Sequence, residues 1–338
     1  MGRVRKYLTT LTAFGLLAVV GLVATAGHYT AALDPNAGKP GETVVEIPPG
    51  ANLRQAAGML ERRHLIRSAR AFEWLARLTG KAGKIQPGEY RLSAAMPPGD
   101  MLDRMVRGDV VLHRITLPEG LSVREIITRL EQAGFGDAED YRALIERPDF
   151  AERHGVATDG VKVPFEGYLF PDTYLFARGA TPEQIINTLL ERLNSVFTPD
   201  RLRVMKQLGW NRHQVLTLAS LIEKETALQS ERARISAVFH NRLIHHMRLQ
   251  TDPTVIYATP DFDGDIRRRD LKRDDPYNTY RHHGLPPGPI ANPGEAAIHA
   301  ALFPADDTAL YFVARGDGSH EFSETVESHN RAVRRHQK

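Results

Sequence analysis

The sequence predicts an α+β fold in three parts: an N-terminal transmembrane helix, a small α+β domain and a larger mixed α+β domain. Three observations carry this prediction. A long uncharged segment follows a basic start, a strand–helix–helix–strand pattern comes next, and amphipathic helices joined by polar loops fill the remainder. The chain has 338 residues, which is enough for about two globular domains besides the helix.

The first 27 residues have the features of a membrane anchor. Arg3, Arg5 and Lys6 open the chain, and no Asp, Glu, Lys or Arg follows them before position 34. The segment from Leu8 to Ala26 approaches the roughly 20 apolar residues that a helix needs to cross a bilayer. Because basic residues favour the cytoplasmic end of such a helix, we expect the N-terminus in the cytoplasm and the remaining chain outside.

The alternative for this segment is a cleaved signal peptide. Ala24, Thr25 and Ala26 are small residues of the kind found at a cleavage site. In both interpretations the residues after this segment are exported from the cytoplasm. The anchor predicts a single-pass protein of the cytoplasmic (inner) membrane, with its larger domain on the periplasmic side. Residues 28–43 are polar and punctuated by Pro and Gly, so we expect a linker there.

A short repeat marks the start of each globular domain. "IPPGANLRQAAGMLE", from Ile47 to Glu61, aligns with "LPEGLSVREIITRLE", from Leu117 to Glu131. Each copy predicts a short strand, a turn containing Pro and Gly, and an amphipathic helix. We therefore expect the domains at 44–112 and 113–338 to begin with related α+β elements.

The first copy continues into a second helix and a strand. "RSARAFEWLARLTG" predicts a helix with Phe72, Leu75 and Leu78 as its apolar stripe, and "IQPGEYRLS" predicts a turn and a strand. This strand–helix–helix–strand layout resembles the small carbohydrate-binding domains of LysM type. Since the comparison rests on layout alone, a plain α+β packing domain is the alternative.

Composition and spacing exclude several kinds of site. The chain has no cysteine, so disulfide scaffolds, thiolate metal sites and cysteine nucleophiles are excluded. Its 44 basic and 41 acidic residues are scattered, which is not typical of a nucleic-acid-binding surface. The doublets His245–His246 and His282–His283 lack the HExxH spacing of a zinc site, and the chain has neither a G-x-S-x-G motif nor a phosphate-binding loop. We therefore expect no metal, no cofactor and no nucleic-acid partner.

Two glutamates, Glu223 and Glu225, lie in an apolar helical stretch that starts after Asn211, a residue suited to an N-cap. At about 100° per residue, the side chains of Leu218, Leu221 and Ile222 project within about 60° of Glu225. Glu223 lies about 200° from Glu225, so one helix cannot direct both carboxyls into one cleft. This spacing argues against a retaining glycosidase pair, whose carboxyls lie about 5 Å apart.

An inward carboxyl at Glu225 has two interpretations. Burial in apolar surroundings raises the pKa of a carboxyl, so Glu225 would stay protonated near neutral pH and serve as a general acid. The alternative is a structural glutamate paired with an arginine, such as Arg232 or Arg234. The helix geometry alone leaves both interpretations open.

Stretches after this helix are rich in Tyr, Asn, Gln, Asp, Pro and Gly, as loops that line a polar cleft are. They contain the blocks "MRLQTDPTVIY", "YNTY", "GLPPGPIANPG" and "HEFSETVESHN". Further blocks are "EGYLFPDTY" before the helix and "EKET", "SER" and "NRL" within the helical stretch. Together they resemble the MltG-type (YceG-like) endolytic murein transglycosylases. The resemblance runs from about Val45 to Asn330 and is strongest from Leu218 onward.

The resemblance implies a function and a site. The substrate would be the peptidoglycan glycan strand, cleaved within the chain between MurNAc and GlcNAc to leave 1,6-anhydro-MurNAc ends. The catalytic residue falls on Glu225, the second glutamate of "EKET". The implied partners are the glycan strands and the peptidoglycan synthases, whose nascent strands such an enzyme would terminate. The implied substrate-binding residues are Glu166, Gln250, Asp252, Tyr257, Asn278 and Tyr280.

Two alternative functions stay open. A lysozyme-type hydrolase would use water as its final nucleophile, usually with a second carboxylate such as Asp252. A non-catalytic wall-binding scaffold of the cell-wall synthesis machinery would leave Glu225 with a structural role only. Product analysis distinguishes the three functions, because they give anhydro ends, reducing ends or no cleavage.

Overall fold

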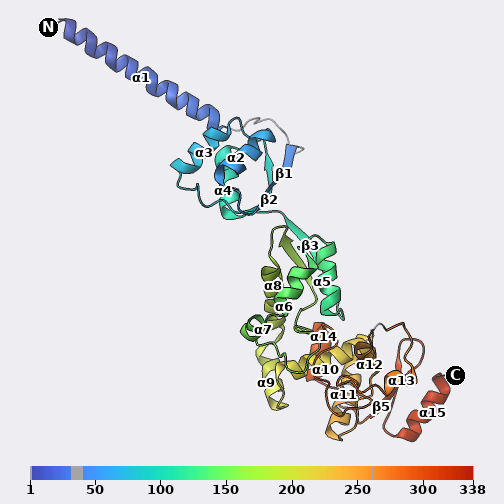
Figure 1. Cartoon of the computed structure of the whole chain (residues 1–338). Coiled ribbons are helices and arrows are strands. Elements are labelled where there is room, and N and C mark those ends of the chain that lie inside the picture. Colours follow the sequence, from blue (N-terminus) through green and yellow to red (C-terminus); the bar gives the residue numbers. More distant parts are fainter. Residues whose placement is uncertain (1, 32–40, 261, 338) are drawn as a thin grey trace. The chain divides into compact units, whose positions relative to one another are not determined.

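The computed structural model describes residues 2–31, 41–260 and 262–337, with side chains from residue 15 onward. Its helices and strands form two compact units (Figure 1). The first unit comprises Met1–His113 and Leu175–Ala180, and the second comprises Arg114–Tyr174 and Thr181–Lys338. The described residues form helices and three two-stranded sheets, in agreement with the predicted α+β class.

The chain begins with a long helix, α1 (Gly2–Thr30). In its described part, the apolar side chains between Leu16 and Val23 are exposed. None of the helices in the described residues combines the length and the apolar character that crossing a membrane requires. The predicted span starts at Leu8, and the side chains before residue 15 lie outside the described part of the chain. Residues 32–40 of the predicted linker also lie outside it.

The rest of the first unit has the predicted strand–helix–helix–strand order, followed by one more helix. These elements are β1 (Glu42–Ile47), α2 (Leu53–Arg62), α3 (Ala69–Leu78), β2 (Gly88–Ser93) and α4 (Pro98–Arg107). β1 pairs with β2 in antiparallel register, with Val45 opposite Tyr90. Buried apolar side chains from all five elements form the core of this unit.

The apolar stripe of α3 differs from the prediction. Phe72 is buried, but Leu78 is 81% exposed. Three residues along a helix rotate by about 300°, which is about 60° short of a full turn. Leu78 lies two such steps after Phe72 and therefore points about 120° away from it. Ala76, which lies four residues after Phe72, is buried instead.

From β3 onward the chain forms most of the second unit. The next elements along the chain are β3 (Leu112–Thr116), α5 (Val123–Gln132), α6 (Ala138–Ile145), α7 (Pro148–Arg153), β4 (Thr173–Ala177), α8 (Pro182–Val196) and α9 (Pro199–Gln207). They are followed by α10 (Arg212–Glu225), α11 (Gln229–Ile244), α12 (Asp252–Ala258), α13 (Arg268–Leu271), α14 (Glu295–Leu302), β5 (Tyr311–Ala314), β6 (His320–Ser323) and α15 (Val326–His336). β5 and β6 form an antiparallel hairpin against which α15 packs.

Both copies of the repeat adopt the predicted strand–turn–helix structure. In each copy the turn contains a glycine with positive φ, 78° at Gly50 and 77° at Gly120. Glycine suits these positions because a side chain makes this backbone conformation unfavourable. A capping box then starts α2 at Asn52 and α5 at Ser122.

The helix α10 runs through the core of the second unit. Its N-cap is Asn211, as predicted, since the Asn211 side chain accepts a hydrogen bond from the backbone of Gln214. All eight residues from 215 to 222 are buried, so the helix is surrounded by protein on every side. It packs against α11, α12 and α14. This packing fixes the C-terminal end of α10, where both glutamates lie.

Candidate active site

Glu225 is the last residue of α10 and lies in a cleft of the second unit. The chain leaves the helix at Thr226, whose backbone is extended with φ −144°. The cleft has a volume of about 480 Å³. Besides Glu225 it is lined by Arg242, Leu249, Gln250, Asp252, Tyr280, Tyr311, Phe312, Val313, Ala314, His320, Val326, His329, Val333 and Gln337.

The environment of Glu225 favours its protonated form more than water does. The pKa of Glu225 is raised to about 7, mainly by burial and also by the neighbouring Asp252 carboxylate. A hydrogen bond from the Thr251 hydroxyl and the positive charge of Arg242 oppose this rise. Near neutral pH the carboxyl therefore populates both protonation states, as a group that donates and then accepts a proton must.

Arg242 is a buried cation beside this carboxyl. Its Nε donates to the carbonyl of Leu310 at 2.7 Å, and its Nη1 donates to the carbonyls of Leu249 at 2.7 Å and Arg248 at 3.2 Å. The guanidinium also lies over the ring of Tyr311, 5.1 Å from its centroid. These contacts hold a positive charge at a fixed place in the cleft.

Glu223 points away from the cleft, as the helix geometry predicts. One of its carboxylate oxygens pairs with Arg232 at 2.8 Å, and the other accepts the backbone N–H of Gly294 at 3.0 Å. Arg234 pairs with Asp307 instead. The two ion pairs suggested for a structural Glu225, with Arg232 or with Arg234, are therefore not formed. It is Glu223 that forms the buried ion pair.

Three of the predicted substrate-binding residues line the cleft with Glu225. The exposed Asp252 begins α12 and accepts a hydrogen bond of 2.6 Å from the hydroxyl of Tyr280. Gln250 adopts a positive φ of 50°, and its backbone N–H donates to the carbonyl of Thr279 at 3.2 Å. The structure thus brings Gln250, Asp252 and Tyr280 together around the carboxyl.

Glu166 and Tyr257 do not line this cleft. Glu166 is buried and accepts hydrogen bonds from the backbone of Val123 at 2.9 Å and from Asn292 at 3.2 Å. The hydroxyl of Tyr257 donates to the other oxygen of Glu166 at 3.4 Å. Burial raises the pKa of Glu166 to about 8. This carboxyl therefore joins the start of α5 to α12 inside the protein.

Asn278 does not line the cleft either. It is fully buried, and its amide donates to the carbonyls of Asp270, Leu271 and Arg273 at 3.2, 3.1 and 2.8 Å. Its carbonyl oxygen accepts the backbone N–H of Tyr280 at 3.0 Å. Asn278 thus closes the C-terminal end of α13 and orients the residue that carries the Tyr280 ring.

Several residues that line the cleft or contact Glu225 have no counterpart among the predicted site residues. They are Arg242, Thr251, Tyr311, His320 and His329. Arg242 stands in the "NRL" block, Thr251 between Gln250 and Asp252, and the other three between Tyr311 and Asn330. Their blocks were visible in the sequence, but nothing in the sequence distinguished these side chains from their neighbours.

The histidine doublets lie apart from the carboxyl. His283 contacts the carbonyl of His246 at 2.9 Å, and His282 lies 3.4 Å from Asp274. Among the described residues, no group of three or more His, Asp or Glu side chains is arranged to hold a metal ion.

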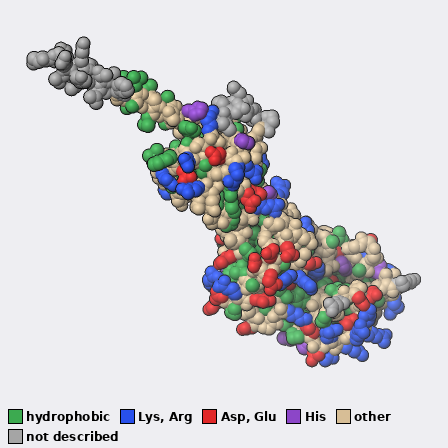
Figure 2. Space-filling model, turned by 45° about the horizontal axis from the view of Figure 1, so that its top comes forward, with side chains coloured by type: hydrophobic (Ala, Val, Ile, Leu, Met, Phe, Trp, Pro, Cys, Tyr) green, Lys and Arg blue, Asp and Glu red, His purple; other side chains and the backbone are tan. Residues whose placement is uncertain are grey.

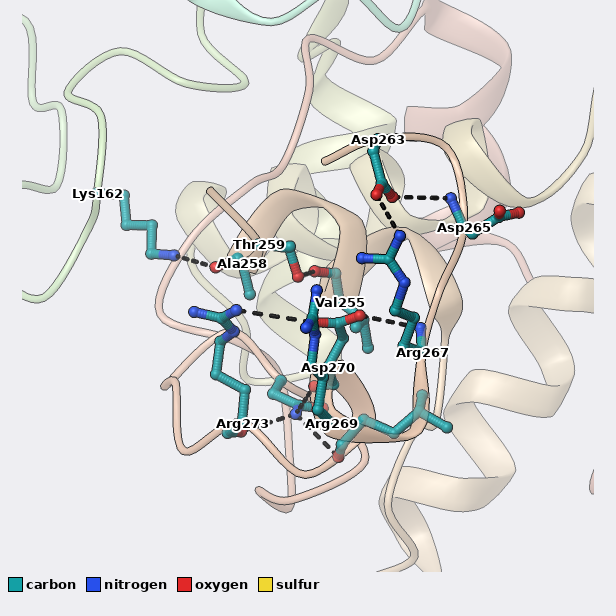
Figure 3. Close-up of polar contacts among 12 residues, drawn as sticks. Lys162, Val255, Ala258, Thr259, Asp263, Asp265, Arg267, Arg269, Asp270 and Arg273 are labelled. Atoms are coloured by element: carbon teal, nitrogen blue, oxygen red, sulfur yellow. Dashed lines mark hydrogen bonds and ion pairs between the residues drawn. The ribbon is translucent and has the colours of Figure 1, made fainter. Parts of the chain in front are cut away.

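The charged surface of the second unit carries both signs on the face shown in Figure 2. The densest basic run, from Arg267 to Arg273, is interleaved with acids. Arg267 pairs with Asp263, and its backbone N–H donates to the buried Asp270 at 2.9 Å, with Arg273 3.6 Å from the same carboxylate (Figure 3). The basic run is therefore partly neutralised within its own segment.

Known proteins resemble this chain over most of its length. A model of the YceG-like family matches residues 45–335. The chain belongs to the YceG-like family. An endolytic murein transglycosylase of Bacillus subtilis (strain 168) is 34% identical to it over 300 residues, which cover 85% of this chain and 83% of the relative. An endolytic murein transglycosylase of Streptococcus pneumoniae serotype 2 (strain D39) is 29% identical over 320 residues, covering 86% of this chain and 58% of the relative.

The fold is also known in this family. A YceG-like protein from Listeria monocytogenes with a crystal structure is 33% identical and superposes with a TM-score of 0.60, covering 86% of this chain and 98% of that chain. The region shared with the YceG-like family includes strand β2, the second half of β1 and the complete lining of the cleft except Gln337. The family resemblance inferred from the sequence blocks is confirmed.

Proposed function

We propose that this YceG-like protein is an endolytic peptidoglycan lytic transglycosylase, which cleaves glycan strands internally between MurNAc and GlcNAc. The observation that carries the proposal is the partly buried carboxyl of Glu225, with a pKa of about 7, in a cleft lined by Gln250, Tyr280 and Tyr311. Aromatic faces and amide groups suit a sugar polymer. Relatives that bear the name endolytic murein transglycosylase support the same activity.

Glu225 acts first as an acid and then as a base. Its protonated carboxyl gives a proton to the glycosidic oxygen while the bond from MurNAc C1 to that oxygen breaks. The resulting carboxylate accepts the proton of the MurNAc C6 hydroxyl, whose oxygen bonds to C1 and closes the 1,6-anhydro ring. No water is consumed, and the enzyme returns to its starting protonation state. The fixed charge of Arg242 stabilises the carboxylate between the two steps.

The remaining predicted site residues have two kinds of role in this proposal. Gln250, Asp252 and Tyr280 contact the sugars, because they share the cleft with the acid. Glu166, Tyr257 and Asn278 support the cleft from within the protein, because their polar atoms are bonded to other parts of the chain.

The rival with a specific observation in its favour is a lysozyme-type hydrolase. Asp252 is a second carboxylate in the same cleft, exposed to solvent and held by Tyr280. In a hydrolase it would activate water, and the product would have a reducing end.

One digestion separates these functions. Purified glycan strands are incubated with the full chain in ¹⁸O-labelled water, and the products are analysed by mass spectrometry. A transglycosylase gives anhydro ends without label, a hydrolase gives reducing ends with one label, and a wall-binding scaffold gives no cleavage. Glu225→Gln is the matched control, because it keeps the shape of the side chain and removes the transferable proton.

We also propose that the N-terminal segment anchors the protein in the cytoplasmic membrane, with the cleft on the outer side. The basic start and the uncharged residues up to position 33 support an anchor, as do the exposed apolar side chains between Leu16 and Val23. A reporter fused to the C-terminus should be active only when exported. Mature protein that begins after Ala26 and washes off membranes would reject the anchor while leaving export intact.

We further propose that the small domain, residues 44–112, holds glycan in the manner of a LysM domain and that the enzyme works beside peptidoglycan synthases. The β1–α2–α3–β2 order supports the first proposal. Deleting this domain should lower retention on purified sacculi. Unchanged retention by a truncated protein that melts cooperatively would make the domain a spacer. Crosslinking in cells should recover a synthase with the full chain.

A further inference from the structure

We infer that Thr251 is the positioning residue for Glu225: its hydroxyl fixes the carboxyl and leaves Oε2 as the oxygen that carries the reacting proton. This inference rests on the proposed function, because it concerns the same site. It adds a residue that acts through Glu225.

The contact itself assigns the protons. The hydroxyl of Thr251 donates to Oε1 of Glu225. Thr251 is 2% exposed, and among the described residues its hydroxyl has no other acceptor. A hydroxyl has a single proton to donate. Since that proton points at Oε1, the acidic proton of the neutral carboxyl lies on Oε2, the oxygen left free of Thr251.

A network of hydroxyls holds Thr251 in place. Its backbone N–H donates to Oγ1 of Thr279 at 3.0 Å, and its carbonyl accepts from Oγ1 of Thr254 at 2.7 Å. The hydroxyls of Thr254 and Thr279 lie 2.9 Å apart. Because the proton of Thr254 goes to the carbonyl, Thr279 is the donor in this pair.

This network is independent of the helix that carries Glu225. It joins the start of α12 to the segment around Thr279, and none of its three threonines belongs to α10. The carboxyl is therefore fixed from two sides, by the buried end of α10 and by Thr251. An extended residue, Thr226, follows Glu225, so the helix alone does not enclose the carboxyl.

The hydroxyl acts on Glu225 together with the charges of the cleft. A hydrogen bond to a carboxyl stabilises the carboxylate more than the neutral acid, so losing it raises the pKa of Glu225. The other titratable groups that line the cleft are Arg242, Asp252, Tyr280, Tyr311, His320 and His329. All of them remain in a Thr251 variant, so a shift in its pH profile reports the lost hydroxyl.

Three variants of the full chain test the inference. Thr251→Val removes the hydroxyl and nearly keeps the shape, while Thr251→Ser keeps the hydroxyl. Thr254→Val is the matched control, because it removes a hydroxyl of the same network that does not touch Glu225. For each variant, kcat and KM for strand cleavage are measured between about pH 5 and 9, together with thermal melting.

We expect Thr251→Val to lower kcat about tenfold with little change in KM, and to move the alkaline limb of the kcat profile up by about one pH unit. Thr251→Ser should restore both. Thr254→Val should lower the melting temperature and leave the pH of the alkaline limb of the kcat profile unchanged. A folded Thr251→Val protein whose alkaline limb lies at the wild-type pH would overturn the inference. An equal shift of the alkaline limb in Thr254→Val would overturn it as well.

If the wild type cleaves no strands, the proposed function fails and the inference is tested by carboxyl ¹³C NMR. The titration of Glu225 is followed in wild type and in Thr251→Val. A higher pKa in the variant supports the positioning contact, and identical titrations refute it.

Discussion

Replacing Glu225 with Gln is the most informative perturbation of this protein. Glutamine has the size of glutamate and offers an oxygen to the Thr251 hydroxyl, but it has no acidic proton to transfer. General acid–base catalysis typically contributes about 10²–10⁴-fold to a rate. We therefore expect anhydro-muropeptide release to fall by at least about 100-fold.

The structure shows why this carboxyl is suited to the reaction. An ordinary glutamate with a pKa of 4.5 is about 0.3% protonated at pH 7. With a pKa of about 7, Glu225 is about half protonated at that pH, which is a gain of about 150-fold in the acidic form. The wild-type rate should therefore decline as the pH rises above about 7, because the acid loses its proton.

The raised pKa of Glu225 also predicts how Glu225→Gln changes the melting temperature at different pH values. A carboxyl whose pKa is higher in the folded protein stabilises the fold at low pH, and this contribution is lost as the pH rises through the folded value. The pKa of this carboxyl is 4.5 in an unfolded chain and about 7 in the folded protein. Its contribution to the free energy of unfolding therefore falls by about 3 kcal/mol between low pH and pH 8. Glu225→Gln should therefore melt at a higher temperature than the wild type at pH 8, and at a similar temperature at pH 5.

Two measurements on the purified full chain decide the matter: mass spectrometry of released anhydro-muropeptides and thermal melting at both pH values. A folded Glu225→Gln protein with more than half of the wild-type activity would refute the role of this carboxyl. Equal melting temperatures at pH 8 would instead refute the burial argument and leave the catalytic role standing.

Three further substitutions separate catalytic from structural roles. Glu223→Gln breaks the buried pair with Arg232, so it should lower the free energy of unfolding by about 3 kcal/mol in denaturant titrations. The folded variant should keep most of its activity, and a folded but inactive protein would contradict this prediction. Asn278→Ala leaves three carbonyls without their donor and should cost about 2–4 kcal/mol of stability, whereas a normal melting curve with a raised KM would make it a substrate contact. Tyr280→Phe frees Asp252 and should lower kcat/KM about tenfold without changing the melting temperature, and wild-type kinetics would exclude Tyr280 from substrate positioning.

Much of the local structure follows from short sequence signals. The turns at Gly50 and Gly120 and the capping of α10 by Asn211 could be predicted, because turn and cap geometries depend on a few adjacent residues. The stripe of α3 shows the limit of this approach. Apolar residues three apart drift around a helix, so only packing decided that Ala76 and not Leu78 faces the core.

The sequence by itself determined the class of protein, the family and which of the two glutamates faces inward. The order of its blocks identifies the YceG-like family, and the angle between Glu223 and Glu225 on one helix separates the inward carboxyl from the other. The family follows from the order of blocks along the chain, and the inward carboxyl follows from the spacing of two residues that are close in the chain.

Only the tertiary structure decided what surrounds that inward carboxyl. Thr251 and Arg242 reach Glu225 from other elements, Arg232 pairs with Glu223, and Asn278 turns inward although it stands in a block that resembles a cleft loop. The physical reason is that burial and hydrogen bonding, which set the pKa of a carboxyl and the role of an amide, depend on which distant segments pack together. Side-chain type gives no information about that packing.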